Sequence, residues 1–393
     1  DMLNADNGTY DSWYWAHPPM YMPENCNLED VAHIRKFVDI PVVCAGRMDD
    51  PDTALEALQN GECDMISLGR PLLADPDYCN KLRSGRMCQI RPCISCHEGC
   101  MGRIATYSLI NCAVNPQAAR ERAMAYEPIL QKKKVLVVGG GVAGCEAARV
   151  LAIRGHQPVL FEKSGRLGGN LLPGGAPKFK EDDIALANWY AQEMDRLAVE
   201  VHLNTEITKK DILEGDYDTV IMATGSTPKV FSLGDDEKVY TASQVLLKEK
   251  DCGETTVVVG GGLVGCETAL WLAKQGKKVT IVEAQDKILK VNGPLCHSNS
   301  DMLAALLPFH NVEILTSAKV TGYADGKLSV ETADGVKELA CDSVILSVGY
   351  NEENSLYHEV EFDVPEIYLL GDAKKVANIM YAIWDAFEVA NHI

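Results

Sequence analysis

The sequence has 393 residues, of which 47% are hydrophobic, and its 56 acidic against 37 basic residues give a net charge of −19. This length predicts two or three domains rather than one hydrophobic core. The acidity disfavours nucleic acid and anionic membranes as partners, and no stretch reaches the roughly 18 apolar residues of a membrane helix. Fourteen scattered cysteines without a recognisable signal peptide favour a reducing, cytoplasmic environment.

Two predicted strands in the N-terminal region each end in Gly-Arg. They read PVVCAG at 41–46 and CDMISLG at 63–69, and the helix between them starts at an Asp-Pro pair. In a (β/α)8 barrel, the loops after the last two strands usually bind phosphate. The residues that would supply amides and guanidinium groups to such a site are Gly46, Arg47, Gly69 and Arg70. A surface ion pair is the weaker interpretation of Arg70.

Four cysteines follow in residues 91–112, with the spacing C-x2-C-x3-C-x11-C. They are Cys93, Cys96, Cys100 and Cys112. Thiolates are the ligands of iron–sulfur clusters and also of structural zinc, so the residue type leaves both open. The spacing differs from the paired C-x2-C knuckles of zinc ribbons, which makes zinc the weaker alternative and disulfides weaker still. Cys88, just upstream, is expected to be a bystander.

The clearest internal repeat consists of residues 134–163 and 256–284. Each copy reads as an apolar strand, a G-x-G-x-x-G turn, a helix and a second apolar strand, which together predict a βαβ unit that binds a dinucleotide. Glu162 and Glu283 each follow the first glycine by 23 positions, where a carboxylate can accept from ribose hydroxyls. Two such units predict FAD together with a nicotinamide cofactor. The turn glycines are Gly139, Gly141 and Gly144, then Gly260, Gly262 and Gly265.

Two further segments add to this pattern. Residues 218–228 contain a strand that runs into Ala-Thr-Gly, and residues 366–375 contain a strand that ends in Gly-Asp. Both resemble signatures of two-dinucleotide flavoprotein reductases, and this resemblance assigns the first unit to FAD and the second, inserted unit to NAD(P)H. Residues 163–180 contain no cysteine, which disfavours a disulfide reductase.

The resemblance also implies the residues that contact each dinucleotide. For FAD they are Gly139, Gly141, Ala143, Gly144, Glu162, Lys163, Gly169, Asn170, Ala223, Thr224, Gly225, Gly371 and Asp372. For NADH they are Gly260, Gly262, Gly265 and Glu283.

The order of the segments resembles the old yellow enzyme-like NADH:flavin oxidoreductases of the 2-enoate reductase and 2,4-dienoyl-CoA reductase type. The stretch AGRMDDPDTALEALQNGECDMISLGRPLLADPD resembles the barrel end that holds the FMN phosphate, and GTYDSWYWAHPPMY, RLGGNLLPGGAP and NIMYAIWDAFEVANHI are similar to 2-enoate reductases. The resemblance covers essentially the whole chain. It implies an α/β protein with the C-terminal end of a TIM (β/α)8 barrel, a four-cysteine segment that holds one [4Fe–4S] cluster, and two Rossmann-like domains for FAD and NAD(P)H.

The implied boundaries follow this order. The domains are residues 1–86 for the end of the FMN-binding barrel, 87–128 for the cluster segment and linker, 129–250 for the first part of the FAD domain, 251–349 for the NAD(P)H domain and 350–393 for the return to the FAD domain. Only the last two barrel strands are expected in the first of these, and a complete member would have six more strands before residue 1.

By the same resemblance, electrons pass from NADH through FAD and the [4Fe–4S] cluster to FMN, which reduces the C=C bond of an α,β-unsaturated acid, ketone or CoA ester. Tyr14 and His17 lie in the loop where relatives place a substrate-side acid, although packing is the competing interpretation. The alternatives are an amine dehydrogenase of the trimethylamine dehydrogenase type, which the intact second glycine turn disfavours, and a non-catalytic remnant. We further expect a small enoate or enone substrate, an anaerobic setting and a homo-oligomer.

Overall fold

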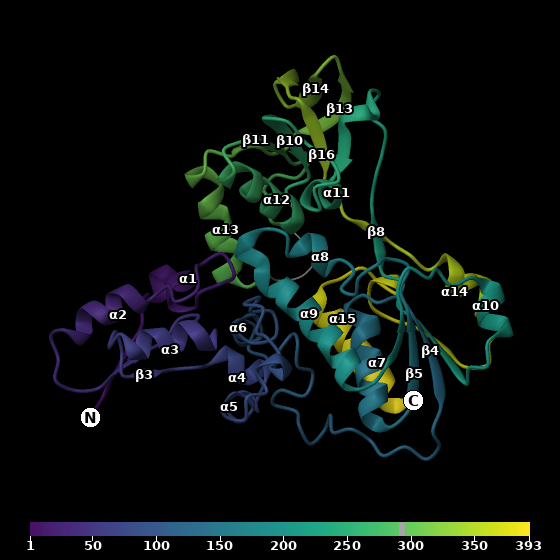
Figure 1. Ribbon diagram of the computed structural model, residues 1–393. Coiled ribbons are helices and arrows are strands. Elements are labelled where there is room, and N and C mark those ends of the chain that lie inside the picture. The colour runs from purple at the N-terminus through teal and green to yellow at the C-terminus, as the bar shows by residue number, and fades with distance from the viewer. Residues whose placement is uncertain (291–294) are drawn as a thin grey trace.

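The computed structural model describes residues 1–290 and 295–393. It contains a small parallel sheet near the N-terminus, an irregular segment with short helices, and two α/β lobes (Figure 1). The chain leaves the first lobe, forms the second lobe and returns to the first lobe, where it ends. This is the α/β architecture that the sequence predicts. None of the helices in the described ranges combines the length and the hydrophobicity that crossing a bilayer requires.

The N-terminal sheet forms the predicted barrel end. Its parallel strands, adjacent in chain order, are β1 (Leu3–Ala5), β2 (Val42–Cys44) and β3 (Met65–Ile66). Helix α2 (Leu28–Arg35) lies between β1 and β2, and α3 (Pro51–Gln59) lies between β2 and β3. Asp50 caps α3 by accepting a hydrogen bond from the amide of Thr53 at 3.0 Å. The prediction of only two strands here was wrong, because β1 is a third; three residues are too few to give an alternating pattern.

The segment that carries the four cysteines is largely irregular. Its helical turns are α4 (Arg70–Ala74), α5 (Tyr78–Arg83), η2 (Met87–Gln89) and α6 (Met101–Ala105). Two tryptophans of the first lobe fix this segment through its backbone. The indole of Trp189 donates to the carbonyl of Gln89 at 3.2 Å, and that of Trp384 donates to the carbonyl of Cys112 at 3.0 Å.

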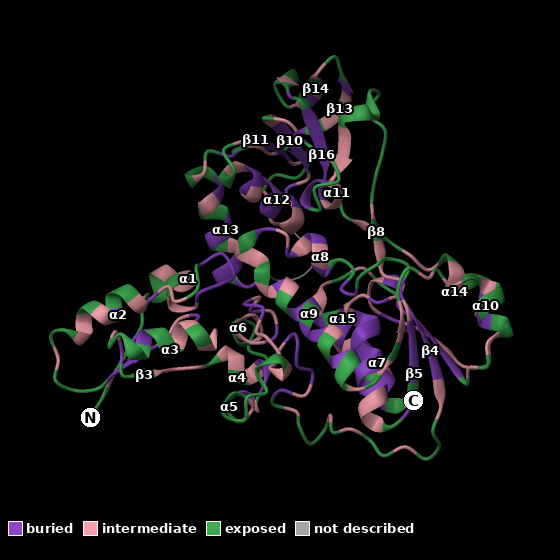
Figure 2. Ribbon diagram, in the orientation of Figure 1, coloured by how far each residue is buried: buried purple, intermediate pink, exposed green. Residues whose placement is uncertain are grey.

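The first lobe is a parallel sheet with helices on both faces. Its strand order is β18-β7-β4-β5-β6, formed by Ile367–Leu369, Thr219–Met222, Lys134–Val138, Gln157–Phe161 and Glu200–His202. One face is covered by α7 (Val142–Arg154), α9 (Glu181–Arg196) and α15 (Ile379–His392). The other face is covered by α10 (Lys209–Glu214) and α14 (Ser355–Val360). Residues 135–138 of β4 pack alternately into these two cores, so the strand is buried after its first residue (Figure 2).

The second lobe repeats this plan with one difference. Its parallel strand order is β12-β11-β10-β16-β9, formed by Glu313–Leu315, Lys278–Val282, Thr255–Val259, Ser343–Leu346 and Val239–Thr241. Helices α11 (Ala242–Leu246), α12 (Leu263–Lys274) and α13 (His297–Phe309) pack on one face. The other face is covered by an antiparallel sheet of β13 (Lys319–Ala324), β14 (Lys327–Thr332) and β15 (Gly335–Ala340).

The two lobes are joined by a short antiparallel ribbon of β8 (Ser226–Pro228) and β17 (Tyr350–Glu352). The predicted start of the second lobe at residue 251 is too late, because β9 and α11 already belong to its sheet and core. The predicted return at residue 350 falls at the start of β17.

A buried polar network connects three parts of the chain. The Tyr21 hydroxyl, from the loop between α1 (Trp13–Ala16) and α2, donates to Glu267 on α12 at 2.8 Å. Lys180, which precedes α9, lies 2.9 Å from the other oxygen of Glu267 and 3.5 Å from Asp183. Burial alone would lower the pKa of Lys180, but the two carboxylates outweigh it and raise that pKa. The barrel end and both lobes therefore meet at one charged contact.

Candidate functional site

Both glycine turns have the same backbone arrangement. Each follows a central strand, β4 or β10, and opens a helix, α7 or α12. A Cβ on Gly144 or Gly265 would collide with the carbonyl of the first glycine of the same turn, so helix and strand lie as close as this fold requires. A Cβ on Gly141 or Gly262 would meet no atom within 4 Å. Space is therefore open where a pyrophosphate would approach, and both turns fit a dinucleotide.

The acidic residues at the ends of the next strands brace these turns. Glu162 accepts from the amide of Gly140 at 2.7 Å, and Glu283 accepts from the amide of Gly261 at 2.5 Å. The second oxygen of Glu283 accepts from the amide of Gln285 at 2.7 Å. Each carboxylate has about four lone-pair sites, so acceptor capacity remains for ribose hydroxyls.

Substituting the middle glycine of each turn should distinguish the FAD site from the NADH site, because each substitution should affect only one ligand. Gly141→Ala should lower FAD retention, and Gly262→Ala should retain FAD but raise the KM for NADH. Neither methyl group would collide with the protein, so each would obstruct only its ligand. The measurements are flavin content after gel filtration and NADH oxidation with a dye acceptor. Loss of FAD in the Gly262→Ala variant would contradict this assignment.

Glu283 should also set the choice of nucleotide. Its carboxylate lies at the turn, where it can accept from ribose hydroxyls but would repel a 2′-phosphate, and Lys290 is held by Asp286 at 3.2 Å. We expect NADH to reduce the flavin faster than NADPH does. Glu283→Gln should bring the two rates of flavin reduction closer together. Stopped-flow reduction with each nucleotide measures this. Equal rates in the unmodified chain would show that the phosphate is accommodated elsewhere.

The remaining predicted FAD residues converge at the same edge of the first sheet. The Ala-Thr-Gly turn ends β7 and the Gly-Asp pair follows β18, and these strands are neighbours. Ser226 donates to Asp372 at 2.9 Å, and Asn170 donates to Ser226 at 3.4 Å. Gly169 lies against Gly141. Three separate segments thus surround the first glycine turn.

The other predicted FAD residues lie close to this turn or to the next strand. Lys163 is exposed beside Glu162, and Ala143 packs against Gly371. The Thr224 hydroxyl donates to the carbonyl of Glu353.

The four predicted ligand cysteines line one small cavity together with Arg70 and His97. Burial is the main cause of a raised pKa in all four thiols, to about 12 for Cys93 and about 11 for Cys112. Within the described ranges every cysteine is a free thiol, and no three His, Cys, Asp or Glu side chains are close enough to hold a single metal ion. Four soft sulfur donors around a cavity fit an iron–sulfur cluster.

Arg70 connects the barrel end to the cysteine segment. Its guanidinium lies 2.7 Å from Nε2 of His97, whose Nδ1 lies 2.7 Å from the Asn299 side-chain oxygen. Because a guanidinium can only donate, Nε2 accepts and Nδ1 donates. Burial and then Arg70 lower the pKa of His97 and also that of His17. The predicted FMN residue Arg70 thus meets the cysteine segment here.

The other predicted barrel residues have different neighbours. Arg47 is buried, donates to the carbonyl of Pro19 at 3.2 Å and pairs with Asp182 of α9 at 3.0 Å. Its Nε is buried and lacks a partner among the described residues, so one donor remains for a phosphate. Gly69 opens α4, and a Cβ there would meet no atom within 4 Å, whereas Gly46 packs tightly on Asn27. Tyr14 packs against the core of the second lobe.

Sequence reasoning missed several residues near these sites. His97, Asn299, Asp182 and Trp384 were not singled out, because each acts through contacts between segments far apart in the chain. For His97 a signal existed: its position inside the cysteine loop made burial near the thiols predictable.

These features define a protein with two dinucleotide-binding lobes attached to the end of a barrel. Residues 133–386 match the pyridine nucleotide-disulphide oxidoreductase family, and residues 7–89 match the NADH:flavin oxidoreductase / NADH oxidase family. The chain belongs to the pyridine nucleotide-disulphide oxidoreductase family, whose match covers more than half of it, and its N-terminal part is similar to the NADH:flavin oxidoreductase / NADH oxidase family. The two matches together confirm the predicted resemblance to the 2-enoate reductase type.

Named relatives agree with this assignment. Cinnamate reductase of Clostridium sporogenes is 50% identical over all of this chain and 59% of its own length. Metal reductase of Desulforamulus reducens is 34% identical over 99% of this chain and 63% of its own length. A 2-naphthoyl-CoA reductase structure has a TM-score of 0.92 and 29% identity over all of this chain and 60% of that protein. The chain thus spans about three fifths of the length of these relatives.

Proposed function

We propose that the chain belongs to an enoate reductase, in which NADH and a proton reduce the C=C bond of an α,β-unsaturated carboxylate to the saturated acid, with release of NAD⁺. In this proposal the first glycine turn would hold FAD, the second NADH, the four cysteines a [4Fe–4S] cluster and Arg70 the FMN phosphate. When bound, the flavins and the nicotinamide would supply hydride transfer, and the cluster would supply single-electron transfer. The likeness to a cinnamate reductase supports an aryl-substituted enoate as the substrate.

One observation carries the proposal: Arg70 lines the same cavity as the four cysteines. Arg70 is the residue at the end of the last barrel strand that would hold the FMN phosphate, and the thiols would hold the cluster. The contact between Arg70 and His97 supports this arrangement, because His97 belongs to the cysteine loop.

The protein would contribute position and electrostatics rather than redox chemistry. Arg70 and the free Nε of Arg47 would bind the FMN phosphate. Trp384 would fix Cys112 relative to α15, the helix that follows the Gly-Asp pair of the FAD site. His17 is the predicted substrate-side residue, and burial and then Arg70 lower its pKa.

The free thiols throughout the described residues support a reducing, cytoplasmic environment. An anaerobic setting and a homo-oligomer stay predictions from the resemblance. An amine dehydrogenase is the second candidate, but an intact second turn with Glu283 favours a nicotinamide donor.

The test is anaerobic incubation of the native protein, at the length the cell makes it, with NADH and cinnamate. We expect one 3-phenylpropanoate formed for each NADH oxidised, and no reduction of the protein by dimethylamine or trimethylamine. NADH oxidation without a saturated product would contradict enoate reduction. Reduction by an amine, without NADH, would support the oxidative alternative.

A further inference from the structure

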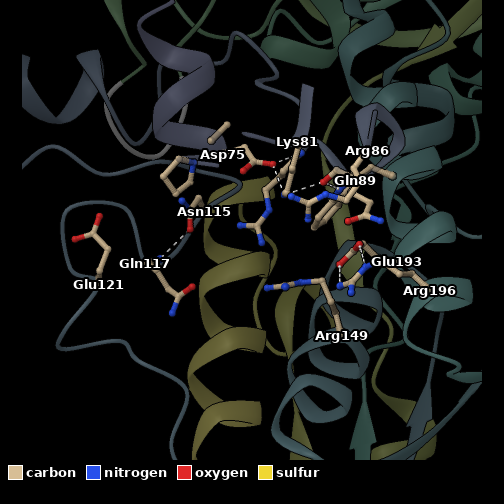
Figure 3. A pocket seen from close by; sticks show the side chains of 14 residues that line it. Asp75, Lys81, Arg86, Gln89, Asn115, Gln117, Glu121, Arg149, Glu193 and Arg196 are labelled. Atoms are coloured by element: carbon tan, nitrogen blue, oxygen red, sulfur yellow. Dashed lines mark hydrogen bonds and ion pairs between the residues drawn. The ribbon is translucent and has the colours of Figure 1, made fainter. Parts of the chain in front are cut away.

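A second cavity, of about 340 Å³, lies where the cysteine segment meets the first lobe (Figure 3). Its walls come from α4, α5 and η2, from the chain after Cys112, and from α7 and α9. Neither the four cysteines nor the residues of the two glycine turns line it. The cavity is therefore separate from the cofactor sites described above.

The lining carries more positive than negative charge, although the chain as a whole is strongly acidic. The basic residues are Lys81, Arg86, Arg91, Arg149 and Arg196, and the acidic residues are Asp75, Glu121 and Glu193. Three of the basic residues pair closely with carboxylates, Lys81 with Asp75 at 2.6 Å, Arg196 with Glu193 at 2.6 Å and Arg149 with Glu146 at 2.8 Å, and Arg86 lies 3.8 Å from Asp77. Arg91 is the basic lining residue that has no carboxylate partner among the described residues.

Arg149 directs an unused donor into the cavity. Its side chain is only 4% exposed, and Nε and Nη2 bind the carboxylate of Glu146 at 2.9 and 2.8 Å. Nη2 also donates to Tyr126, whereas Nη1 has no hydrogen-bond partner in the described part of the chain. The guanidinium extends into the cavity in Figure 3. The wall thus holds a buried guanidinium that is paired with Glu146 on one edge and has a free N–H group on the other.

Arg91 supplies a second cation from the cysteine segment. Its guanidinium lies 4.8 Å from the centre of the buried Trp189 ring, and its Nη1 donates to the carbonyl of Val114 at 2.8 Å. Among the described residues no carboxylate pairs with it, and its Nε and Nη2 have no hydrogen-bond partner. The indole and the carbonyl hold this guanidinium in one orientation, so its free donors are preorganised.

We propose that this cavity binds a phosphoryl group, either as inorganic phosphate or as part of a small phosphate ester. Guanidinium groups match the oxygens of phosphate with paired, charge-assisted hydrogen bonds. The volume lies at the lower end of the range for small-molecule pockets, which leaves room for a group larger than free phosphate. Because Arg91 and Arg149 come from the cysteine segment and the first lobe, the bound anion bridges the two.

The test is calorimetric titration of the full, FAD-loaded chain with inorganic phosphate, AMP and adenosine. We expect saturable binding of phosphate, AMP or both, and none of adenosine. Arg91→Gln removes one charged donor, and Gln117→Glu adds a negative charge to the wall; each should weaken binding by about tenfold or more. Arg83→Gln is the matched control, because this exposed residue of α5 does not line the cavity, and it should bind as the unmodified chain does.

Tighter binding of AMP than of phosphate would identify an ester as the ligand, and equal binding would identify the free anion. Absence of saturable binding would overturn the proposal, and so would unchanged affinity in both Arg91→Gln and Gln117→Glu. Loss of binding in Arg47→Gln but not in Arg91→Gln would place the anion at the predicted FMN phosphate site and would also overturn it.

Discussion

Replacing Cys96 by Ser should remove the iron–sulfur cluster and interrupt electron flow beyond FAD. The Cys96 thiol lines the cavity shared by all four cysteines, and a serine hydroxyl is a harder, weaker ligand for iron than a thiolate. Anaerobically purified protein should contain about four iron and four sulfide per chain. In the variant both should fall close to zero, and the broad visible shoulder of the cluster should disappear.

NADH oxidation with a dye acceptor should survive in Cys96→Ser, because both glycine turns lie outside this segment. Cys88→Ser is the matched control, since Cys88 is exposed and does not line the cavity. Iron, sulfide and zinc analysis of the unmodified protein, Cys96→Ser and Cys88→Ser tests whether Cys96 is a cluster ligand. Stoichiometric zinc in the unmodified protein, or iron retained in Cys96→Ser, would show that the ligand assignment is wrong.

Lys180→Met should be strongly destabilising, because it removes a single buried charge from a paired network. The Lys180 side chain is 11% exposed, and its ammonium group faces Glu267 and Asp183, whose side chains are 8% and 4% exposed. Removing it leaves two buried carboxylates without their cation, and breaking such a pair costs about 3–5 kcal/mol. Thermal unfolding of the FAD-loaded chain measures the effect as a lowered Tm.

Lys178→Met is the control for this prediction, because Lys178 is exposed and only two residues away. Adding Glu267→Gln to Lys180→Met should recover part of the stability, since the amide oxygen can still accept from Tyr21 while one buried charge is removed. A Lys180→Met protein as stable as Lys178→Met would contradict the buried network.

Features that depend on local sequence were predictable. The two glycine turns, the acids 23 positions later and the cysteine spacing are short patterns, and the structure places the turns on the strands and helices expected of them. Short strands were not predictable. β1 and β9 have three residues each, which is too few to show a periodicity. For this reason β1 was not predicted, and the start of the second lobe was placed too late.

Contacts between distant segments were not predictable either. Tyr21 and Glu267 are separated by 246 positions, and Arg47 and Asp182 by 135. No sequence pattern encodes such pairs, because they depend on how the barrel end packs against both lobes. The same holds for the cavity between Arg91 and Arg149, whose walls come from separate parts of the chain.

Anaerobic reduction of the FAD-loaded, cluster-containing chain by NADH examines the electron path itself. We expect NADH to bleach the flavin absorbance and to produce the electron paramagnetic resonance signal of a reduced [4Fe–4S] cluster. In Gly262→Ala both changes should require a chemical reductant such as dithionite, because only the nicotinamide site is obstructed. An oxidised flavin after NADH addition, in unmodified protein that dithionite still reduces, would contradict the proposed path from NADH through FAD to the cluster.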